Sequence, residues 1–306
     1  MEIYLPVAQL PVNWVALLGL GLAVGFLSGM LGVSGGFVTT PLLIFYGIPS
    51  GVAVASQASP VAAASLVGAL RQGGRKSVDY KMGSWLLLGG LAGSALGVYI
   101  FRVLQQSGQI DFVIKISYLL LLGTVGGLML NESLRALLAA RKGQPADVHK
   151  PGQHTWIHSL PFKQRFYRSK LYISVIPVIV LGFLVGVMTA ILGTGGAFIL
   201  IPAKVYLLRM RTNMAIGTSQ FQMFIVASMA TLLHAEIDHT VDIVLSFLLV
   251  LGGVVGAQFG VGAGARMKGE ELRTLLALLI VGIAIRLLMG LVLTPSDIYS
   301  VVTDLR

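Results

Sequence analysis

The sequence predicts an all-α polytopic membrane protein built from two inverted-topology repeats, and three observations lead to this fold class. Apolar residues make up 56% and charged residues 11% of the 306 residues, and the mean hydropathy is +0.86. Soluble domains carry roughly 25% charged residues. Each half of the chain contains five apolar segments, and one glycine-rich motif occurs once in each half.

The composition also bears on possible partners. The net charge of +10 would suggest nucleic acid in a soluble protein, but here the basic residues lie in loops between apolar segments. Such a distribution sets the orientation of a membrane protein, so we expect a lipid bilayer and no nucleic acid as partner. The 38 glycines allow helices to pack closely in lipid. The absence of cysteine excludes disulfides and thiol chemistry.

The first half contains a complete helix, a short one and three more long ones. The short segment follows a glycine run and spans only about 15 Å, half of a bilayer, so it either dips into the membrane or crosses a thinned region. In the fourth segment, Gly89, Gly93 and Gly97 share one helix face, which predicts close helix packing. The predicted segments are residues 14–31, 37–46, 52–70, 85–101 and 112–130.

Residues 131–170 are predicted to be a cytoplasmic linker between a first repeat, 1–130, and a second, 171–306. The linker carries eight Lys/Arg against two Asp/Glu. Its histidines have no cysteine or carboxylate cluster beside them, so we predict no metal site. The second half repeats the plan, which gives eight to ten transmembrane segments with one short broken helix per half. Its segments are residues 173–192, 198–207, 214–233, 243–263 and 274–293.

Loop charges predict that the two repeats have opposite orientations. Matching residues are 161 positions apart up to the short segments and 163 apart afterwards. The loop 71–81 has four basic residues and one acidic residue, whereas its counterpart 234–242 has three acidic residues and no Lys or Arg. Because cytoplasmic loops are enriched in Lys and Arg, we expect both termini outside and the linker inside.

The two glycine breaks, LGVSGGFVTTP at residues 31–41 and LGTGGAFILIP at residues 192–202, predict a binding site. Backbone N–H groups at a helix start attract anions, and irregular backbone at membrane depth lines a cavity or is buried in protein. The alternative is that these glycines only permit a kink or tight packing. Polar side chains within a bilayer usually face a cavity. The predicted substrate-binding residues are Ser34, Gly35, Gly36, Thr39, Ser56, Gln57, Thr194, Gly195, Gly196, Ser219 and Gln220.

Two cations inside predicted segments, Lys204 and Arg286, complete this set of substrate-binding residues. No acidic residue lies inside a predicted segment to pair with them. An unpaired cation in hydrocarbon costs at least about 2.5–3.5 kcal/mol, and a transported anion would be one partner. The alternatives are that Lys204 snorkels to the membrane surface and that Arg286 binds helix-end carbonyls.

Enzymatic function is not predicted. The chain has no HExxH, no GxSxG, no GxxxxGK[ST] and no cysteine, and no pair of carboxylates lies within its apolar segments. These patterns would accompany a metalloprotease, a serine hydrolase or an ATP-driven pump. We therefore expect no catalytic residue and no cofactor.

The spaced motifs resemble those of the sulfite exporter TauE/SafE family of membrane permeases. Each glycine break is followed by an alanine-rich sequence, AVASQ at residues 53–57 and AIGTSQ at residues 215–220. The resemblance covers nearly the whole chain except residues 131–170. It implies a multi-pass protein of the bacterial inner membrane that transports sulfite or a related sulfur oxyanion or organosulfonate.

The expected function is secondary transport of a small anion by alternating access. An anion that leaves a cell gains about 2.3 kcal/mol per charge per 100 mV, so export needs no coupled ion. Proton-coupled organic-anion uptake is disfavoured because no predicted segment interior contains Asp, Glu or His. A non-transporting membrane scaffold or assembly factor is the other alternative, and a homo-oligomer is compatible with the sequence.

Overall fold

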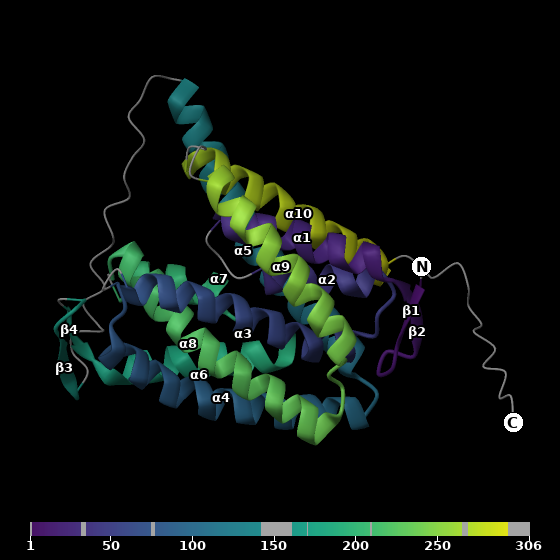
Figure 1. Ribbon diagram of the computed structural model, residues 1–306. Helices are drawn as coiled ribbons and strands as arrows, with labels where there is room; N and C mark the ends of the chain where they lie inside the picture. Colours follow the sequence, from purple (N-terminus) through teal and green to yellow (C-terminus); the bar gives the residue numbers. More distant parts are fainter. Residues whose placement is uncertain are drawn as a thin grey trace, which may run out of the picture.

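The protein is a bundle of long helices with a small β-hairpin at either end (Figure 1). The computed structural model describes residues 2–31, 35–74, 77–141, 161–169, 171–208, 210–264 and 269–292. Within these residues, seven helices are long and apolar enough to cross a membrane, and Trp14–Met30 and Gly36–Phe45 are shorter apolar helices. The predicted all-α polytopic membrane fold is confirmed, since the only strands described are four residues long.

The first half consists of a hairpin and five helices; α1 has its predicted bounds, whereas the other three long helices extend beyond their predicted apolar segments. The fifth helix reaches Arg141 rather than residue 130. In chain order the elements are β1 (Glu2–Leu5), β2 (Leu10–Asn13), α1 (Trp14–Leu31), α2 (Gly36–Phe45), α3 (Ser50–Gly74), α4 (Tyr80–Gln106) and α5 (Ile110–Arg141).

The second half has the same order of elements, with two π-helical segments added. The first, η2, continues the short helix α7 past Pro202, and the second, η3, follows α8. In chain order the elements are β3 (Lys163–Phe166), β4 (Leu171–Ser174), α6 (Val175–Leu192), α7 (Ala197–Pro202), η2 (Ala203–Leu207), α8 (Thr212–Leu233), η3 (His234–Asp238), α9 (Ile243–Gly264) and α10 (Gly269–Val292).

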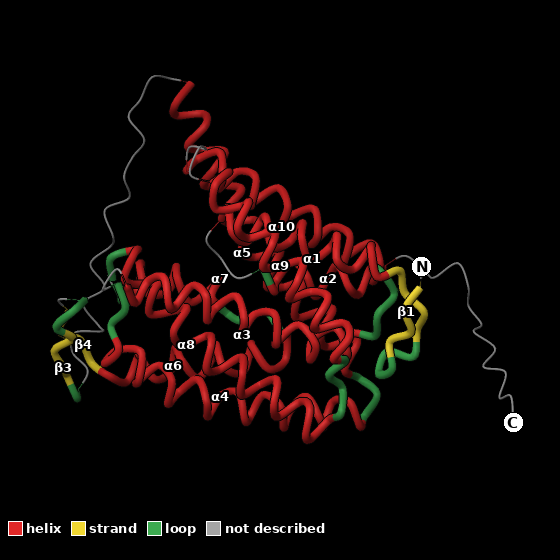
Figure 2. Tube along the Cα trace, in the orientation of Figure 1, coloured by secondary structure: helices red, strands yellow, loops and turns green. Residues whose placement is uncertain are grey.

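Two antiparallel β-hairpins, which the sequence analysis did not predict, precede α1 and α6. Glu2 pairs with Asn13 in the first and Lys163 with Ser174 in the second, so the two hairpins occupy matching positions of the two halves. They lie at opposite ends of the molecule (Figure 2). Part of the segment predicted as a linker is therefore strand β3 and the end of α5, and its residues 142–160 lie outside the described residues.

A buried aspartate from the opposite half holds each hairpin. Asp79 caps the first turn of α4 and also accepts a hydrogen bond from the backbone N–H of Ser169, in the β3–β4 turn, at 3.0 Å. Asp242 likewise accepts a hydrogen bond from the backbone N–H of Leu245, in the first turn of α9. It accepts another from the backbone N–H of Val7, in the β1–β2 turn, at 3.0 Å. Hydrogen bonds to a carboxylate are stronger than neutral ones. The two aspartates therefore join the halves as well as starting two helices.

Glycine brings the two halves into backbone contact at two helix pairs, α1 with α9 and α4 with α6. A Cβ built on Gly93 would lie 2.1 Å from the carbonyl oxygen of Phe183, and one on Gly256 would lie 2.0 Å from a carbonyl oxygen of α1. Real Cβ atoms essentially never come this close. The predicted packing role of Gly89, Gly93 and Gly97 is confirmed, because all three meet the backbone of α6.

The short helix α2 turns back toward the end of the molecule where α1 begins. Leu43, near its C-terminal end, shares a core cluster with Leu17 of α1, whereas Gly35, at its start, faces Val24 further along α1. The segment from α7 to Leu208 returns in the same way toward the start of α6, since both belong to one core cluster. Each glycine break is therefore the tip of a helical hairpin.

Replacing Gly93 by alanine is expected to destabilise the protein, because the new Cβ would force α4 away from α6. Overpacking of this kind costs about 1–3 kcal/mol. Gly123 on α5 is the matched control, since a Cβ there would have no neighbour within 4 Å. Thermal unfolding of the detergent-purified variants measures the difference. Equal melting temperatures for Gly93→Ala and Gly123→Ala would contradict the packing role.

Candidate functional site

A small cavity lies where the first glycine break meets helices α1, α3 and α9. Its volume is about 50 Å³. Gly35, Gly36 and Thr39 line it from the break and the start of α2, and Gln57 lines it from α3. These are four of the residues that the sequence predicted. The rest of the wall consists of Ser28 of α1 and of glycine, alanine and other apolar residues, so the polar groups of the cavity come from the break, Gln57 and Ser28.

The polar groups around the cavity differ in how well they are satisfied. Gly35 is the N-cap residue of α2, and it has no side chain that could accept hydrogen bonds from the first backbone N–H groups of this helix. The hydroxyl of Thr39 donates to the carbonyl of Gly35 at 3.1 Å, as threonine often does within a helix. The Gln57 side chain is 3% exposed, and among the described residues its Oε1 has no hydrogen-bond partner. A buried amide oxygen without a partner is costly, and because it can only accept, the ligand that satisfies it must carry a hydrogen, as water or a protonated oxyanion does.

The second glycine break reaches the first from the other half. Gly193 and Gly196 have φ angles of 63° and 57°, a left-handed backbone that glycine adopts without strain. This backbone ends α6 and starts α7 within four residues. A Cβ built on Gly36 would lie 2.9 Å from the carbonyl oxygens of both Gly193 and Thr194. The two breaks are therefore in backbone contact, and Gly195 and Gly196, which follow in the chain, are buried.

Lys204 follows the second glycine break on the continuation of α7, and it does not line the cavity. It lies on η2, and its Nζ donates to the hydroxyl of Ser219 at 2.9 Å. Its side chain is 0% exposed, which excludes the alternative that it snorkels to the surface. Among the described residues, no carboxylate forms an ion pair with it. A buried ammonium with one hydroxyl partner is poorly compensated, so an anion would be a favourable partner.

Two further predicted residues lie on α3 and α8, away from the cavity lining. Ser56 accepts a hydrogen bond from the backbone N–H of Asp242 at 2.9 Å, so it holds the loop before α9. Gln220 lies against α3, where a Cβ built on Gly68 would be 2.9 Å from its side chain. The structure therefore places Ser56 and Gln220 in contacts between helices of the two halves.

Arg286 is exposed on α10. Its guanidinium lies 5.5 Å from the ring centre of Phe45, at the end of α2, an arrangement that favours a cation–π contact. Arg286 therefore contacts the short helix from outside, and it is not among the residues that line the cavity. Ser34, the remaining predicted residue, lies outside the described residues.

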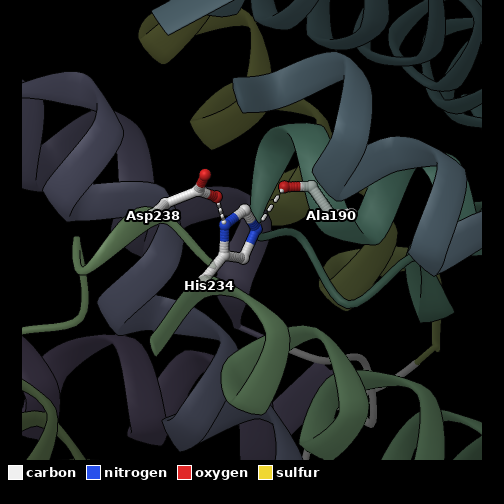
Figure 3. Close-up of polar contacts among 3 residues, drawn as sticks. All are labelled: Ala190, His234 and Asp238. Atoms are coloured by element: carbon white, nitrogen blue, oxygen red, sulfur yellow. Dashed lines mark hydrogen bonds and ion pairs between the residues drawn. The ribbon is translucent and has the colours of Figure 1, made fainter. Parts of the chain in front are cut away.

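A buried pair of titratable side chains, not predicted from the sequence, lies beside the second break. His234 and Asp238 are 1% and 0% exposed, and Nδ1 lies 2.9 Å from Oδ2. Nε2 lies 3.0 Å from the carbonyl oxygen of Ala190, near the end of α6 (Figure 3). The candidate span Asn213–Asp238 extends past the predicted end at residue 233, so both residues lie at the end of this span rather than in its interior. Their spacing of four residues, which puts two side chains on one helix face, was the available signal.

The comparisons agree with this architecture. Residues 17–287 match the family model described as "Sulfite exporter TauE/SafE". The probable membrane transporter proteins YjnA and YunE of Bacillus subtilis (strain 168) are 26% and 25% identical over 275 and 296 residues. These alignments cover 90% and 94% of this chain and 99% and 100% of the relatives.

A further relative is a probable membrane transporter protein of Xylella fastidiosa (strain 9a5c). It is 26% identical over 275 residues, which are 89% of this chain and 93% of the relative. No solved structure matches. Because the family model spans most of the chain and the whole helical bundle except its first and last turns, this chain belongs to the sulfite exporter TauE/SafE family of membrane transporters.

Proposed function

We propose that the protein is a secondary transporter, not an enzyme, and that it carries sulfite or a related sulfur oxyanion or organosulfonate. The cavity beside the first break, lined by Gly36, which contacts the second break, carries this proposal. It is lined by the start of a helix and by the unsatisfied amide oxygen of Gln57, which can accept a hydrogen bond from a protonated oxyanion such as hydrogensulfite. The partial positive charge of a helix start favours an anion, and the low dielectric of a membrane strengthens that attraction.

The size of the cavity favours a small substrate. A cavity that holds a single water has a volume of roughly 10–15 Å³, so a cavity of about 50 Å³ accommodates a few waters. An anion made of one sulfur and three or four oxygens has a similar size. A longer organosulfonate would require the walls from α1 and α9 to move apart. Sulfur oxyanions are therefore the first choice within the proposed class.

The directions of the helices support two repeats of inverted topology. Gly89, Gly93 and Gly97 of α4 meet successive turns of α6 in the same order, so α4 and α6 run in the same direction. The matching helices α1 and α6 start from hairpins at opposite ends of the molecule (Figure 1). Inverted repeats around a central site are the plan of alternating-access carriers.

Charge at the two ends supports cytoplasmic exposure of the β3–β4 end. Lys81 and Arg168 bond to backbone carbonyls in this region, which also carries Lys163 and Arg165. The opposite end holds Asp242, bonded to the β1–β2 turn. Because cytoplasmic loops are enriched in Lys and Arg, both termini are assigned to the outside and residues 142–160 to the inside. The membrane potential then favours export by about 2.3 kcal/mol per charge per 100 mV.

Sulfur oxyanions are expected to stabilise the purified protein more than carboxylates of equal charge do. Binding at a concentration 100 times Kd adds about 2.7 kcal/mol of stability. Gln57→Leu should remove most of this shift, because the cavity loses its amide. The measurement is the melting temperature of the protein in the presence of sulfite, sulfate, thiosulfate, methanesulfonate or acetate. Gln105→Leu, at an exposed site on α4, is the control, and an undiminished shift in Gln57→Leu would exclude the cavity as the site.

Lys204→Gln is expected to weaken transport while leaving the fold intact, since glutamine can still bond to Ser219. Lys204 does not line the cavity in this conformation, so we propose that it contacts the anion in another step of the transport cycle. A charged hydrogen bond there contributes about 1.5–3 kcal/mol, which corresponds to a ten- to hundred-fold lower apparent affinity. Flux of radiolabelled sulfite into liposomes containing only the purified protein gives the measurement. Lys115→Gln on α5, at a half-buried lysine, is the control. Absence of flux in the wild type would instead favour a membrane scaffold.

A reporter that is active only in the cytoplasm is expected to be silent when fused after Arg306, because both termini are proposed to lie outside. The same reporter inserted within residues 142–160 should be active and serves as the positive control. Activity at both positions would mean that the chain crosses the membrane differently from the proposed inverted repeat.

A further inference from the structure

His234 and Asp238 form a buried titratable pair that the proposed substrate site does not use. It is the ion pair found among the described residues, and the ring of Phe101 packs edge-on against the imidazole with 4.6 Å between ring centres. We propose that this pair binds the proton that is co-transported or exchanged with the anion. The proposal deepens the transport function proposed above and rests on it.

The hydrogen bonds of the imidazole determine how many protons the pair holds. The carbonyl of Ala190 can only accept, so Nε2 must carry a hydrogen to bond to it at 3.0 Å. In a neutral imidazole Nδ1 would then be an acceptor, and it would face Oδ2 of Asp238 at 2.9 Å with lone pair against lone pair. One additional proton must therefore lie between Nδ1 and Oδ2. The arrangement in Figure 3 is that of the proton-loaded pair, which has no net charge.

Release of this proton must break one of the two hydrogen bonds. With a single hydrogen left, the imidazole keeps either the Ala190 carbonyl or the Asp238 carboxylate as partner. The carboxylate is preferred, because a bond to an ionised acceptor is about twice as strong as a neutral one. Unloading the pair therefore frees the end of α6 from η3.

The unloaded pair is also unstable in its present surroundings. The second carboxylate oxygen of Asp238, Oδ1, is buried and has no hydrogen-bond partner among the described residues. An ionised carboxylate with one bonded oxygen is costly to keep away from water. A conformation that hydrates Asp238 is therefore favoured when the proton leaves. This links the protonation state of the pair to the conformation of the protein.

Ala190 connects the pair to the contact between the two glycine breaks. It lies three residues before Gly193, whose N–H closes the last turn of α6 on the carbonyl of Thr189 at 2.9 Å. The carbonyl of Gly193 in turn faces Gly36, which lines the cavity. A change at Ala190 therefore reaches the cavity within one helical turn.

The neighbouring titratable groups are exposed or already bonded. The described helices α6 and α8 carry no titratable side chain. Asp242 is buried, but its carboxylate accepts two backbone N–H bonds. The exposed groups on η3, on the residue after it and on the facing turns of α4 are Glu236, His239, Tyr99 and Arg102. Where α4, α6, α8 and η3 meet, His234 and Asp238 are therefore the groups that bind the proton.

Transport in proteoliposomes tests the coupling. Wild-type protein should accumulate radiolabelled sulfite when a pH gradient is imposed at zero membrane potential, with protein-free vesicles as the measure of passive entry. His234→Gln and Asp238→Asn should lose this accumulation and still exchange labelled for unlabelled sulfite without a gradient. Glu236→Gln, which removes an exposed acid from the same element, should respond as the wild type does.

Two outcomes of this experiment would overturn the proposal. Gradient-driven accumulation that persists in both His234→Gln and Asp238→Asn would show that the proton binds elsewhere. Loss of exchange together with accumulation in both variants would give the pair a purely structural role. A wild type that moves no sulfite would contradict the proposed function, and the proton site would then be decided by the spectroscopic test below.

Nitrogen NMR of the imidazole tests the proton site without transport. In a variant that keeps His234 as its single histidine, Nδ1 should carry a hydrogen at high pH, and Nε2 should gain one as the pH falls and the pair is loaded. Asp238→Asn should shift this titration. An Nε2 without hydrogen at low pH, or a titration that Asp238→Asn leaves unchanged, would overturn the proposal.

Discussion

Backbone contact between the two halves is the constraint on which the rest of the structure depends. Lipid provides no hydrophobic force between helices, so close packing of small residues must hold them together. The glycine faces of α1, α4, α6 and α9 allow this, because a carbonyl oxygen of one half occupies the place of a Cβ in the other. The same approach brings Gly36 against Gly193 and joins the two breaks. A shift of these helices would therefore alter the cavity.

The two ends of the molecule are held by buried carboxylates whose two oxygens both accept hydrogen bonds. Asp79 and Asp242 each cap a helix and bind the hairpin of the other half. Both carboxylates accept hydrogen bonds from backbone N–H groups that are rigidly placed. Such bonds stabilise an ionised carboxylate away from water. These aspartates anchor the two ends of the bundle.

Three poorly satisfied polar groups lie on or near the broken helices. Gln57 lines the cavity with a free amide oxygen, Lys204 has one hydroxyl as partner, and Asp238 has one bonded oxygen, all as judged among the described residues. In a transporter, such groups can be compensated by a ligand, a proton or water in another part of the cycle. Their separation into an anion cavity and a proton pair, linked through the end of α6, fits the proposed coupled carrier.

The sequence by itself determined the fold class, the positions of the long helices, the two breaks and the family, because hydrophobic runs and glycine spacing are local patterns. It also identified Gly35, Gly36, Thr39 and Gln57, which line one cavity. Only the tertiary structure revealed the hairpins, whose four-residue strands are too short to give a periodic signal. It also decided that Ser56 holds Asp242 and that His234 meets Ala190, since these partners are 186 and 44 residues apart in the chain. Such contacts depend on how helices pack across the two halves, and no local pattern encodes that packing.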